Sequence, residues 1–196
     1  MTGDAPDPQP PITATHPRRV CPKPGGDETV LGLVLLYVGA VLFVNGIWLL
    51  GRINAREVAI MNIFTGLVGA LVAIFAVAQQ DLASIQLAGY VLLFAFTYLW
   101  VAYNQYIEAE GSGLGWYCLF VAITAVPVSI ITLAEADTVF LSWLGINWAA
   151  WAVLWFLYFL LLAVKRPIQQ LAAYVTIVVG IGTAWLPGFL VLNEYI

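Results

Sequence analysis

Long apolar runs alternate with short polar stretches along the chain. No charged side chain falls inside a run, and the runs are 19 to 25 residues long. Crossing the hydrocarbon core of a bilayer takes roughly 20 helical residues. The pattern predicts six transmembrane helices, over residues 30–50, 58–78, 87–107, 116–134, about 146–164 and 168–192.

Strand-based membrane folds do not fit this pattern. Helices and closed β-barrels are the two folds that satisfy every backbone hydrogen bond in lipid. Barrel strands alternate apolar and polar residues over roughly ten positions, whereas residues 31–36 read Leu-Gly-Leu-Val-Leu-Leu. We therefore expect an all-α membrane protein with six transmembrane helices.

The N-terminal segment, residues 1–29, differs in composition from the rest. It holds seven of the ten prolines and few bulky apolar side chains. Such a segment buries too little apolar surface to offset the entropy of ordering, so we expect a disordered, Pro-rich extension. The apolar run that follows is too long for a secretory signal and has no small-residue cleavage pattern. The membrane domain then covers residues 30–196.

Charged residues are scarce: the 196 residues include 7 basic and 11 acidic ones. They make up 9% of the chain, against roughly a quarter in soluble domains. The net charge of -4 argues against binding to nucleic acid, which is itself negatively charged. Cys21 in the extension and Cys118 in an apolar run lie in different environments, which predicts neither a disulfide framework nor a metal site.

Basic residues in the short loops predict the orientation. Arg52 and Arg56 follow the first run, and Lys165 and Arg166 follow the fifth. These loops share one side of a six-helix chain, and loops 79–86 and 135–145 on the other side have no Lys or Arg. Because basic loops stay cytoplasmic, we expect both termini outside. The three basic residues of the extension weakly oppose this orientation.

The predicted spans contain no Asp, Glu, Lys, Arg or His. Ion-coupled transporters and most ion channels carry such residues inside the membrane. Haem, retinal, zinc and hydrolytic sites also need them, and the sole histidine is His16 in the extension. We therefore expect no enzyme activity, no cofactor and no metal. A pathway for a small neutral molecule, a carbonyl-lined ion pore and a purely structural protein remain open.

An aromatic stripe runs along the fifth predicted helix. Trp148, Trp151 and Trp155 stand at i, i+3 and i+7, and we expect Phe159 to continue the stripe. Such a stripe is often core packing or an interfacial belt, and Trp148 fits a belt. Trp151 and Trp155 lie deeper, where lipid contact more often uses Leu or Val. The stripe therefore also fits the wall of a slot.

A second aromatic face lies in the third run. Phe94, Tyr98 and Gln105 fall within about 40° of one another on a helix, with Thr97 on the flank. Two aromatic walls would sandwich a flat neutral amide such as urea, while hydroxyls and backbone carbonyls replace water at its edges. An ion would find nothing there to offset its desolvation.

The first run carries small and amide residues. Gly32, Gly39 and Gly46 form one stripe at seven-residue spacing, which favours close helix packing, within or between protomers. Asn45, beside Gly46, is a buried amide that needs partners. An interhelical hydrogen bond and a place in a pore wall are both consistent with it.

Two prolines lie inside predicted spans, each shortly after a threonine. Pro127 follows Thr124, and Pro187 follows Thr183. Proline leaves a carbonyl one turn back without its helical donor, and in a membrane that carbonyl needs another partner. A packed kink and a solute-facing carbonyl both account for this pattern.

Ordered sequence blocks occur throughout residues 30–196. They are Leu-Gly-Leu-Val-Leu-Leu-Tyr-Val-Gly at 31–39, Asn-Gly at 45–46, Met-Asn at 61–62, Phe-Thr-Tyr-Leu at 96–99, Trp-Tyr-Cys-Leu-Phe-Val-Ala-Ile at 116–123, Trp-Ala-Val-Leu-Trp at 151–155 and Thr-Ala-Trp-Leu-Pro at 183–187. Together they resemble the AmiS/UreI family of urea and short-chain amide channels.

The resemblance implies a fold, a solute and a set of site residues. It implies three two-helix hairpins around a pore in each protomer, a homohexameric ring in the bacterial plasma membrane, and passive flux of urea or a short-chain amide. It also implies a pore lining, more strongly for Phe94, Tyr98, Trp148, Trp151, Leu154 and Trp155 than for Asn45 and Thr97.

The sequence also departs from the family's acid-gated urea channel. That channel has long external loops rich in histidine and acids, and a glutamate four residues before the Thr of Thr-Ala-Trp. Here the external loops are short and have no His, and Val179 stands in place of the glutamate. The acidic side chains of these loops do not replace the missing histidine, because free carboxyl groups ordinarily titrate at about pH 4. We therefore expect flux that does not depend on pH.

Three functions follow from these observations. The leading one is a passive channel for urea or a short aliphatic amide such as acetamide, two solutes that the sequence does not distinguish. A second is a non-transporting membrane scaffold, in which Trp151 and Trp155 pack against each other or against lipid. A third is a broader channel for water, ammonia or glycerol.

Overall fold

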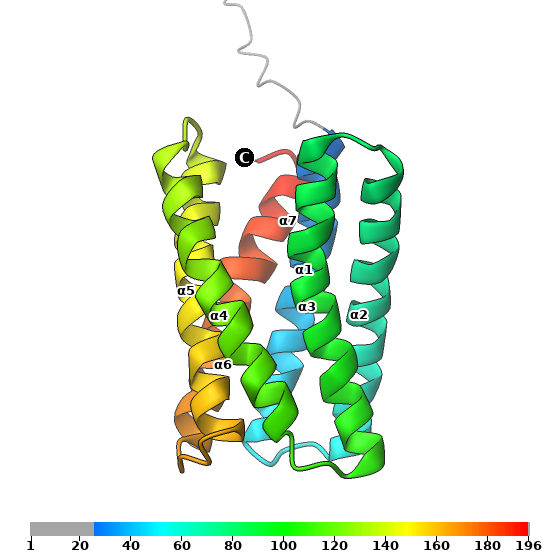
Figure 1. Cartoon of the computed structure of the whole chain (residues 1–196), viewed down its shortest axis with the longest axis vertical. Coiled ribbons are helices and arrows are strands. Elements are labelled where there is room, and N and C mark those ends of the chain that lie inside the picture. Colours follow the sequence, from blue (N-terminus) through cyan, green and yellow to red (C-terminus); the bar gives the residue numbers. More distant parts are fainter. Residues whose placement is uncertain (1–25, 196) are drawn as a thin grey trace, which may run out of the picture.

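The computed structural model describes residues 26–195, and this part of the chain is helical (Figure 1). Six stretches are long and apolar enough to cross a membrane, which confirms the six predicted spans. Five spans are single helices, and the sixth consists of three consecutive elements. The elements are α1 (Gly26–Leu49), α2 (Ala55–Ala78), α3 (Leu82–Ile107), α4 (Ser112–Ala134), α5 (Val139–Leu162), α6 (Gln169–Val179), the π-helix η1 (Gly180–Trp185) and α7 (Leu186–Leu192).

Helices α3 and α5 begin before their apolar runs because a polar residue caps each of them. The Asp81 side chain accepts a hydrogen bond from the backbone N–H of Ser84 at 2.9 Å and starts α3. The Thr138 hydroxyl accepts one from the N–H of Leu141 at 3.1 Å. Helix α5 consequently begins at Val139 instead of at about residue 146. Each cap satisfies a backbone donor that the first helical turn leaves open.

The start of α1 also differs from the predicted boundary. The helix begins at Gly26, within the segment 1–29 that we assigned to the extension. The candidate membrane span within this helix begins at Thr29, and the division of the chain after residue 29 stays a prediction. The disorder predicted for residues 1–25 lies outside the described residues and stays a prediction.

The last span is interrupted by the π-helix η1 between α6 and α7. Pro187 stands in the first turn of α7, where its missing N–H leaves a carbonyl of the preceding turn without a helical donor. The irregularity predicted near Pro187 takes the form of this π-helix. Such segments are rare and often mark functional sites. Pro127, by contrast, lies inside the continuous helix α4.

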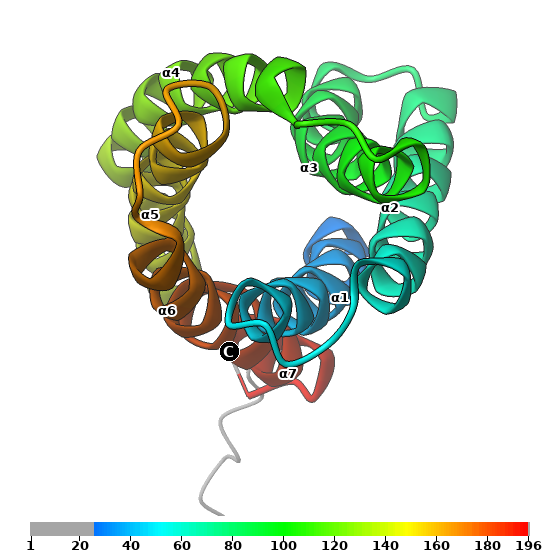
Figure 2. The same cartoon turned by 90° about the horizontal axis from the view of Figure 1, so that it is seen from below.

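Seen along its axis, the bundle is a ring of six spans (Figure 2). Helix α2 packs along α3, and α4 packs along α5, so two neighbouring pairs are hairpins of consecutive helices. The third pair joins α1 to α6, η1 and α7. The first and last spans thus close the ring, and the arrangement of three hairpins that the resemblance implies stays a prediction.

The glycine stripe of α1 packs against this last span. A Cβ atom at Gly39 would collide with the backbone of Trp185, and one at Gly46 would collide with the side chain of Ile177. Small residues let two membrane helices approach closely. The stripe therefore serves packing within one chain.

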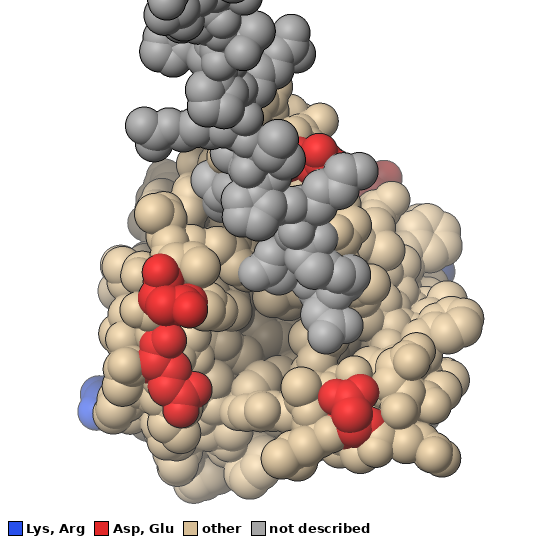
Figure 3. Space-filling view, turned by 90° about the horizontal axis from the view of Figure 1, so that it is seen from above, with Lys and Arg blue, Asp and Glu red and all other residues tan. Residues whose placement is uncertain are grey.

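The two ends of the ring differ in charge. We call the end at which α1 begins the upper end, as drawn in Figure 1. It carries acidic side chains in separate groups (Figure 3). Within residues 26–195, the basic side chains all lie at the lower end, in the connections or in the first turn of α2: Arg52, Arg56, Lys165 and Arg166.

Candidate functional site

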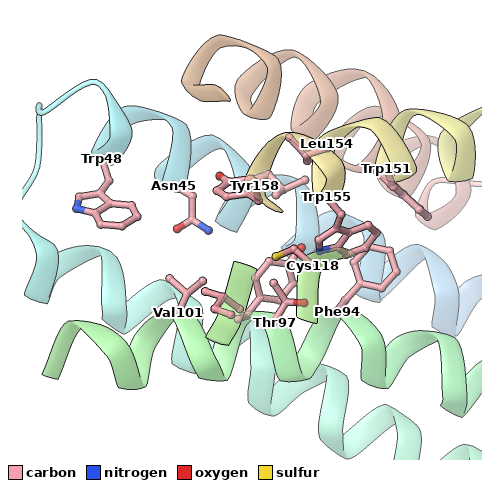
Figure 4. Close-up of a pocket in the computed structure, with 13 residues that line it drawn as sticks. Asn45, Trp48, Phe94, Thr97, Val101, Cys118, Trp151, Leu154, Trp155 and Tyr158 are labelled. Atoms are coloured by element: carbon pink, nitrogen blue, oxygen red, sulfur yellow. The ribbon is translucent and has the colours of Figure 1, made fainter. Parts of the chain in front are cut away.

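Two cavities lie inside the ring, one above the other. The lower cavity has a volume of about 40 Å³, and Figure 4 shows side chains from several helices around it. A space of this size suits water or a solute of a few non-hydrogen atoms, since a cavity needs about 10 to 15 Å³ to hold one water molecule. The lower cavity is lined by Leu42, Asn45, Trp48, Phe94, Thr97, Tyr98, Val101, Leu114, Cys118, Trp151, Leu154, Trp155 and Tyr158.

The upper cavity is larger and more apolar. Its volume is about 120 Å³, and aliphatic side chains make up most of its wall. Trp148 and Tyr90 stand in this wall with their ring centroids 5.2 Å apart. The upper cavity is lined by Leu31, Val34, Leu35, Val38, Leu87, Tyr90, Val91, Phe94, Thr132, Leu144, Trp148 and Trp151.

Two aromatic residues, Phe94 and Trp151, line both cavities and separate them. Their ring centroids lie 4.9 Å apart in an edge-to-face arrangement. Phe94 also meets Trp155 at 4.6 Å and Trp148 at 5.7 Å. Edge-to-face pairs at these distances are favourable for aromatic rings, so the constriction has a defined shape.

A hydrogen-bond chain fixes Trp151 in this constriction. Its indole N–H donates to the hydroxyl of Thr183 at 2.8 Å. That hydroxyl in turn donates to the backbone carbonyl of Val179 at 2.6 Å. Thr183 belongs to η1, so the π-helix presents the acceptor that orients the tryptophan. The partner of Trp151 lies 32 residues away in the sequence.

Asn45 is held at the lower cavity by a second amide. Its Nδ2 donates to Oδ1 of Asn62 at 3.1 Å, and Asn62 Nδ2 donates to Asn45 Oδ1 at 2.6 Å. Asn62 Nδ2 also donates to the Val58 carbonyl at 2.9 Å. Because a carbonyl only accepts, this contact fixes which way both amides face. Asn45 thus combines both roles left open by the sequence, the interhelical bond and the cavity wall.

The remaining predicted residues also face these spaces. Thr97, Tyr98 and Leu154 line the lower cavity, and Trp148 lines the upper one. Thr97 donates its hydroxyl proton to the Leu93 carbonyl at 2.8 Å. All eight residues that we singled out therefore line one or both cavities. Their contact with a solute stays a prediction.

The two residues that extend the aromatic faces by helical spacing, Phe159 and Gln105, do not line the cavities. Phe159 packs against Trp116, with centroids 5.2 Å apart, and belongs to the lining of neither cavity. Tyr158 takes the expected place, and its position at i+3 from Trp155 is the signal that identifies it. Gln105 lies away from both linings and donates to a carbonyl of its own helix.

Neither cavity has a charged side chain in its lining, and residues 26–195 contain no cluster of potential metal ligands. At the upper end, hydrogen bonding from Ser84 holds the pKa of the exposed Asp81 carboxyl below its usual value of 3.8. No group in the walls can compensate a permeating charge. The arrangement suits a small neutral molecule with hydrogen-bonding edges.

Comparison with known proteins agrees with this geometry. Residues 30–195 match the family described as AmiS/UreI family transporter. The chain belongs to the AmiS/UreI family. As members of this family are transporters, the chain is a multi-pass membrane transporter or channel and not an enzyme.

Two curated relatives of the AmiS/UreI family are similar over most of the chain. A putative amidate substrates transporter protein of Mycolicibacterium smegmatis is 42% identical over 166 residues, which are 83% of this chain and 76% of the relative. The acid-activated urea channel of Helicobacter pylori (strain ATCC 700392 / 26695) is 32% identical over 198 residues, covering 85% of this chain and 99% of the relative.

A solved structure from the AmiS/UreI family has the same fold. The cryoEM structure of the Helicobacter pylori urea channel in a closed state matches with a TM-score of 0.77 and 34% identity. The match covers 85% of this chain and 99% of that chain. The six-span ring is therefore the fold of the family.

Proposed function

We propose that the chain is a passive channel for small neutral amides, namely urea or a short aliphatic amide such as acetamide. The observation that carries this proposal is the pair of uncharged cavities on either side of the Phe94–Trp151 constriction. The aromatic walls suit a flat solute, and Asn45, Thr97 and Tyr98 provide polar groups at its edges. Relatives named as an amidate transporter and a urea channel support the same solute class.

The setting that we propose is the bacterial plasma membrane, with both termini outside. In this orientation the basic connections at the lower end face the cytoplasm, as the positive-inside rule requires. We further propose that the protomers form a homohexamer in which each keeps its own pathway. Both cavities lie within one chain, so each protomer has its own lining.

The same channel is proposed to work without an acid gate. Val179 has no titratable group, and its carbonyl accepts the hydroxyl proton of Thr183. The connections at the upper end, between α2 and α3 and between α4 and α5, contain no His. Histidine is the side chain that ordinarily changes charge between pH 7 and pH 5.

Stopped-flow shrinkage of proteoliposomes tests the proposed function. We expect protein-dependent permeability to urea and acetamide that exceeds permeability to glycerol. Trp155→Ala widens the lower cavity and is expected to reduce this discrimination. If no neutral solute passes, the scaffold function holds instead. Comparable flux of water, ammonia and glycerol would indicate the broader channel.

A further inference from the structure

Tyr158 lines the lower cavity, and its hydroxyl is tied to Thr176 of α6. The two hydroxyl oxygens lie 3.0 Å apart. Thr176 is fully buried, and its hydroxyl also contacts the carbonyl oxygen of Ala172 at 2.6 Å. Tyr158 stands between the solute space and this buried pair, with its hydroxyl end drawn on the Asn45 side in Figure 4.

The positions of the protons in this chain follow from the distances. Two oxygens at 2.6 Å need a hydrogen between them, and a backbone carbonyl has none to give. The single hydroxyl proton of Thr176 is therefore used by Ala172. The bond between the two hydroxyls can then form only if Tyr158 is its donor. With its own proton used, the Tyr158 oxygen offers only a lone pair to the cavity.

Two other groups in the same lining are also set as acceptors. The Thr97 proton is used by the Leu93 carbonyl, so the Thr97 oxygen has a lone pair to offer. Asn45 Oδ1 accepts one bond from Asn62 and, as an amide oxygen, has capacity for a second. These acceptors come from α1, α3 and α5, on different sides of one small space.

We propose that Tyr158 determines specificity as a hydrogen-bond acceptor for the N–H groups of the permeating solute, with Thr176 as the residue that positions its proton. The proposal rests on the proposed amide channel and narrows its solute class to molecules with a free amino group on a carbonyl. Such a solute has two or more N–H donors that lose water in an apolar slot, and unpaired donors there are costly.

Tyr158→Phe tests this role because it removes the hydroxyl and keeps the ring. We expect urea and acetamide permeability about three- to tenfold lower, the range that one net hydrogen bond corresponds to. Tyr174→Phe is the matched control, since Tyr174 lies exposed on the outer face of α6 and its variant should behave as wild type.

A second pair of variants tests the positioning role of Thr176. Thr176→Val frees the Tyr158 proton to turn into the cavity and should lower permeability, whereas Thr176→Ser keeps the hydroxyl and should restore it. A merely structural threonine would not be rescued in this way. The pair also decides the matter if Tyr158→Phe fails to fold.

Different results would overturn the proposed amide channel and the role of Tyr158. Wild-type protein that passes no urea or acetamide would overturn the proposed function and this inference with it. Wild-type flux matched by folded Tyr158→Phe and Thr176→Val proteins would overturn the inference alone. Folding of each variant is checked by its elution and melting temperature in detergent.

Discussion

The two cavities of the ring differ in what their walls offer to a solute. The upper cavity is mostly aliphatic, with Thr132 and Tyr90 among its few polar side chains. The lower cavity is lined by the polar residues Asn45, Thr97 and Tyr158, and each of them already forms a hydrogen bond within the protein. In our account a solute passes an apolar vestibule of about 120 Å³ and meets its polar partners in the smaller space of about 40 Å³.

This difference indicates where selectivity arises. An apolar wall distinguishes solutes mainly by size, whereas a site built for specific hydrogen bonds rejects molecules that leave its polar groups unpaired. The lower cavity should therefore set the preference for amides. The upper cavity should be tolerant of changes in its polar groups.

The strongest test of this contrast removes the support of the lower cavity. Asn62→Ala leaves both the oxygen and the NH2 group of the buried Asn45 amide without a partner. We expect a loss of about 2 to 4 kcal/mol in the free energy of unfolding, because two buried groups are unpaired, and a fall of about tenfold in urea flux. Thermal melts and stopped-flow measurements report the two effects.

The control for this variant is Asn193→Ala, which removes an exposed side chain that bonds only within its own helix end. It should change neither melting temperature nor flux. Equal behaviour of the two variants would show that the amide pair does not support the lower cavity.

A smaller effect is expected at the boundary between the cavities. Thr183→Val deprives the Trp151 indole of its acceptor, and we expect urea flux to fall about three- to tenfold as the constriction loses its shape. Thr183→Ser should restore it. Thr124→Val is the matched control, because Thr124 also donates to a carbonyl of its own helix but faces outward. Tryptophan fluorescence should shift in Thr183→Val only.

The upper cavity should respond less than either site. Thr132→Val replaces a polar group in its wall by a side chain of the same shape. We expect urea permeability to stay within about twofold of wild type, since an apolar vestibule makes few obligatory hydrogen bonds. A loss as large as that of Asn62→Ala would contradict the proposed division between the cavities.

We expect urea flux to be the same at pH 7 and at pH 5. Both cavity linings are uncharged. Because the folded-state pKa of Asp81 is lowered, its cap stabilises the fold at pH values above the usual pKa of 3.8. This contribution is lost only as the pH falls through the lowered pKa. Proteoliposome flux across this range measures the expectation. A steep rise toward pH 5 would mean that an acid gate exists.

Much of the fold was predictable because lipid imposes a simple rule on sequence. A span must be long, apolar and free of charge, and the six runs met this rule. The helix starts were harder, since Asp81 and Thr138 extend α3 and α5 through capping bonds beyond the apolar positions. The closure of the ring by α1 and the last span depends on packing between distant segments.

The site was predictable where one helix determines it. Trp148, Trp151 and Trp155 share a face by spacing alone, and that face lines the cavities. The partners of these side chains were not predictable, because they lie on other helices. Thr183 drew attention through the nearby Pro187 and the sequence block that contains both, but its bond to Trp151 depends on the π-helix in three dimensions.

Uptake of radiolabelled urea into proteoliposomes tests the central claim most directly. The account predicts that urea equilibrates with the outside concentration, at the same final level with or without an imposed proton or sodium gradient, and without ionic current. Acetamide should compete. Accumulation of urea above the outside concentration under a gradient, or uptake no faster than in protein-free liposomes, would contradict a passive amide channel.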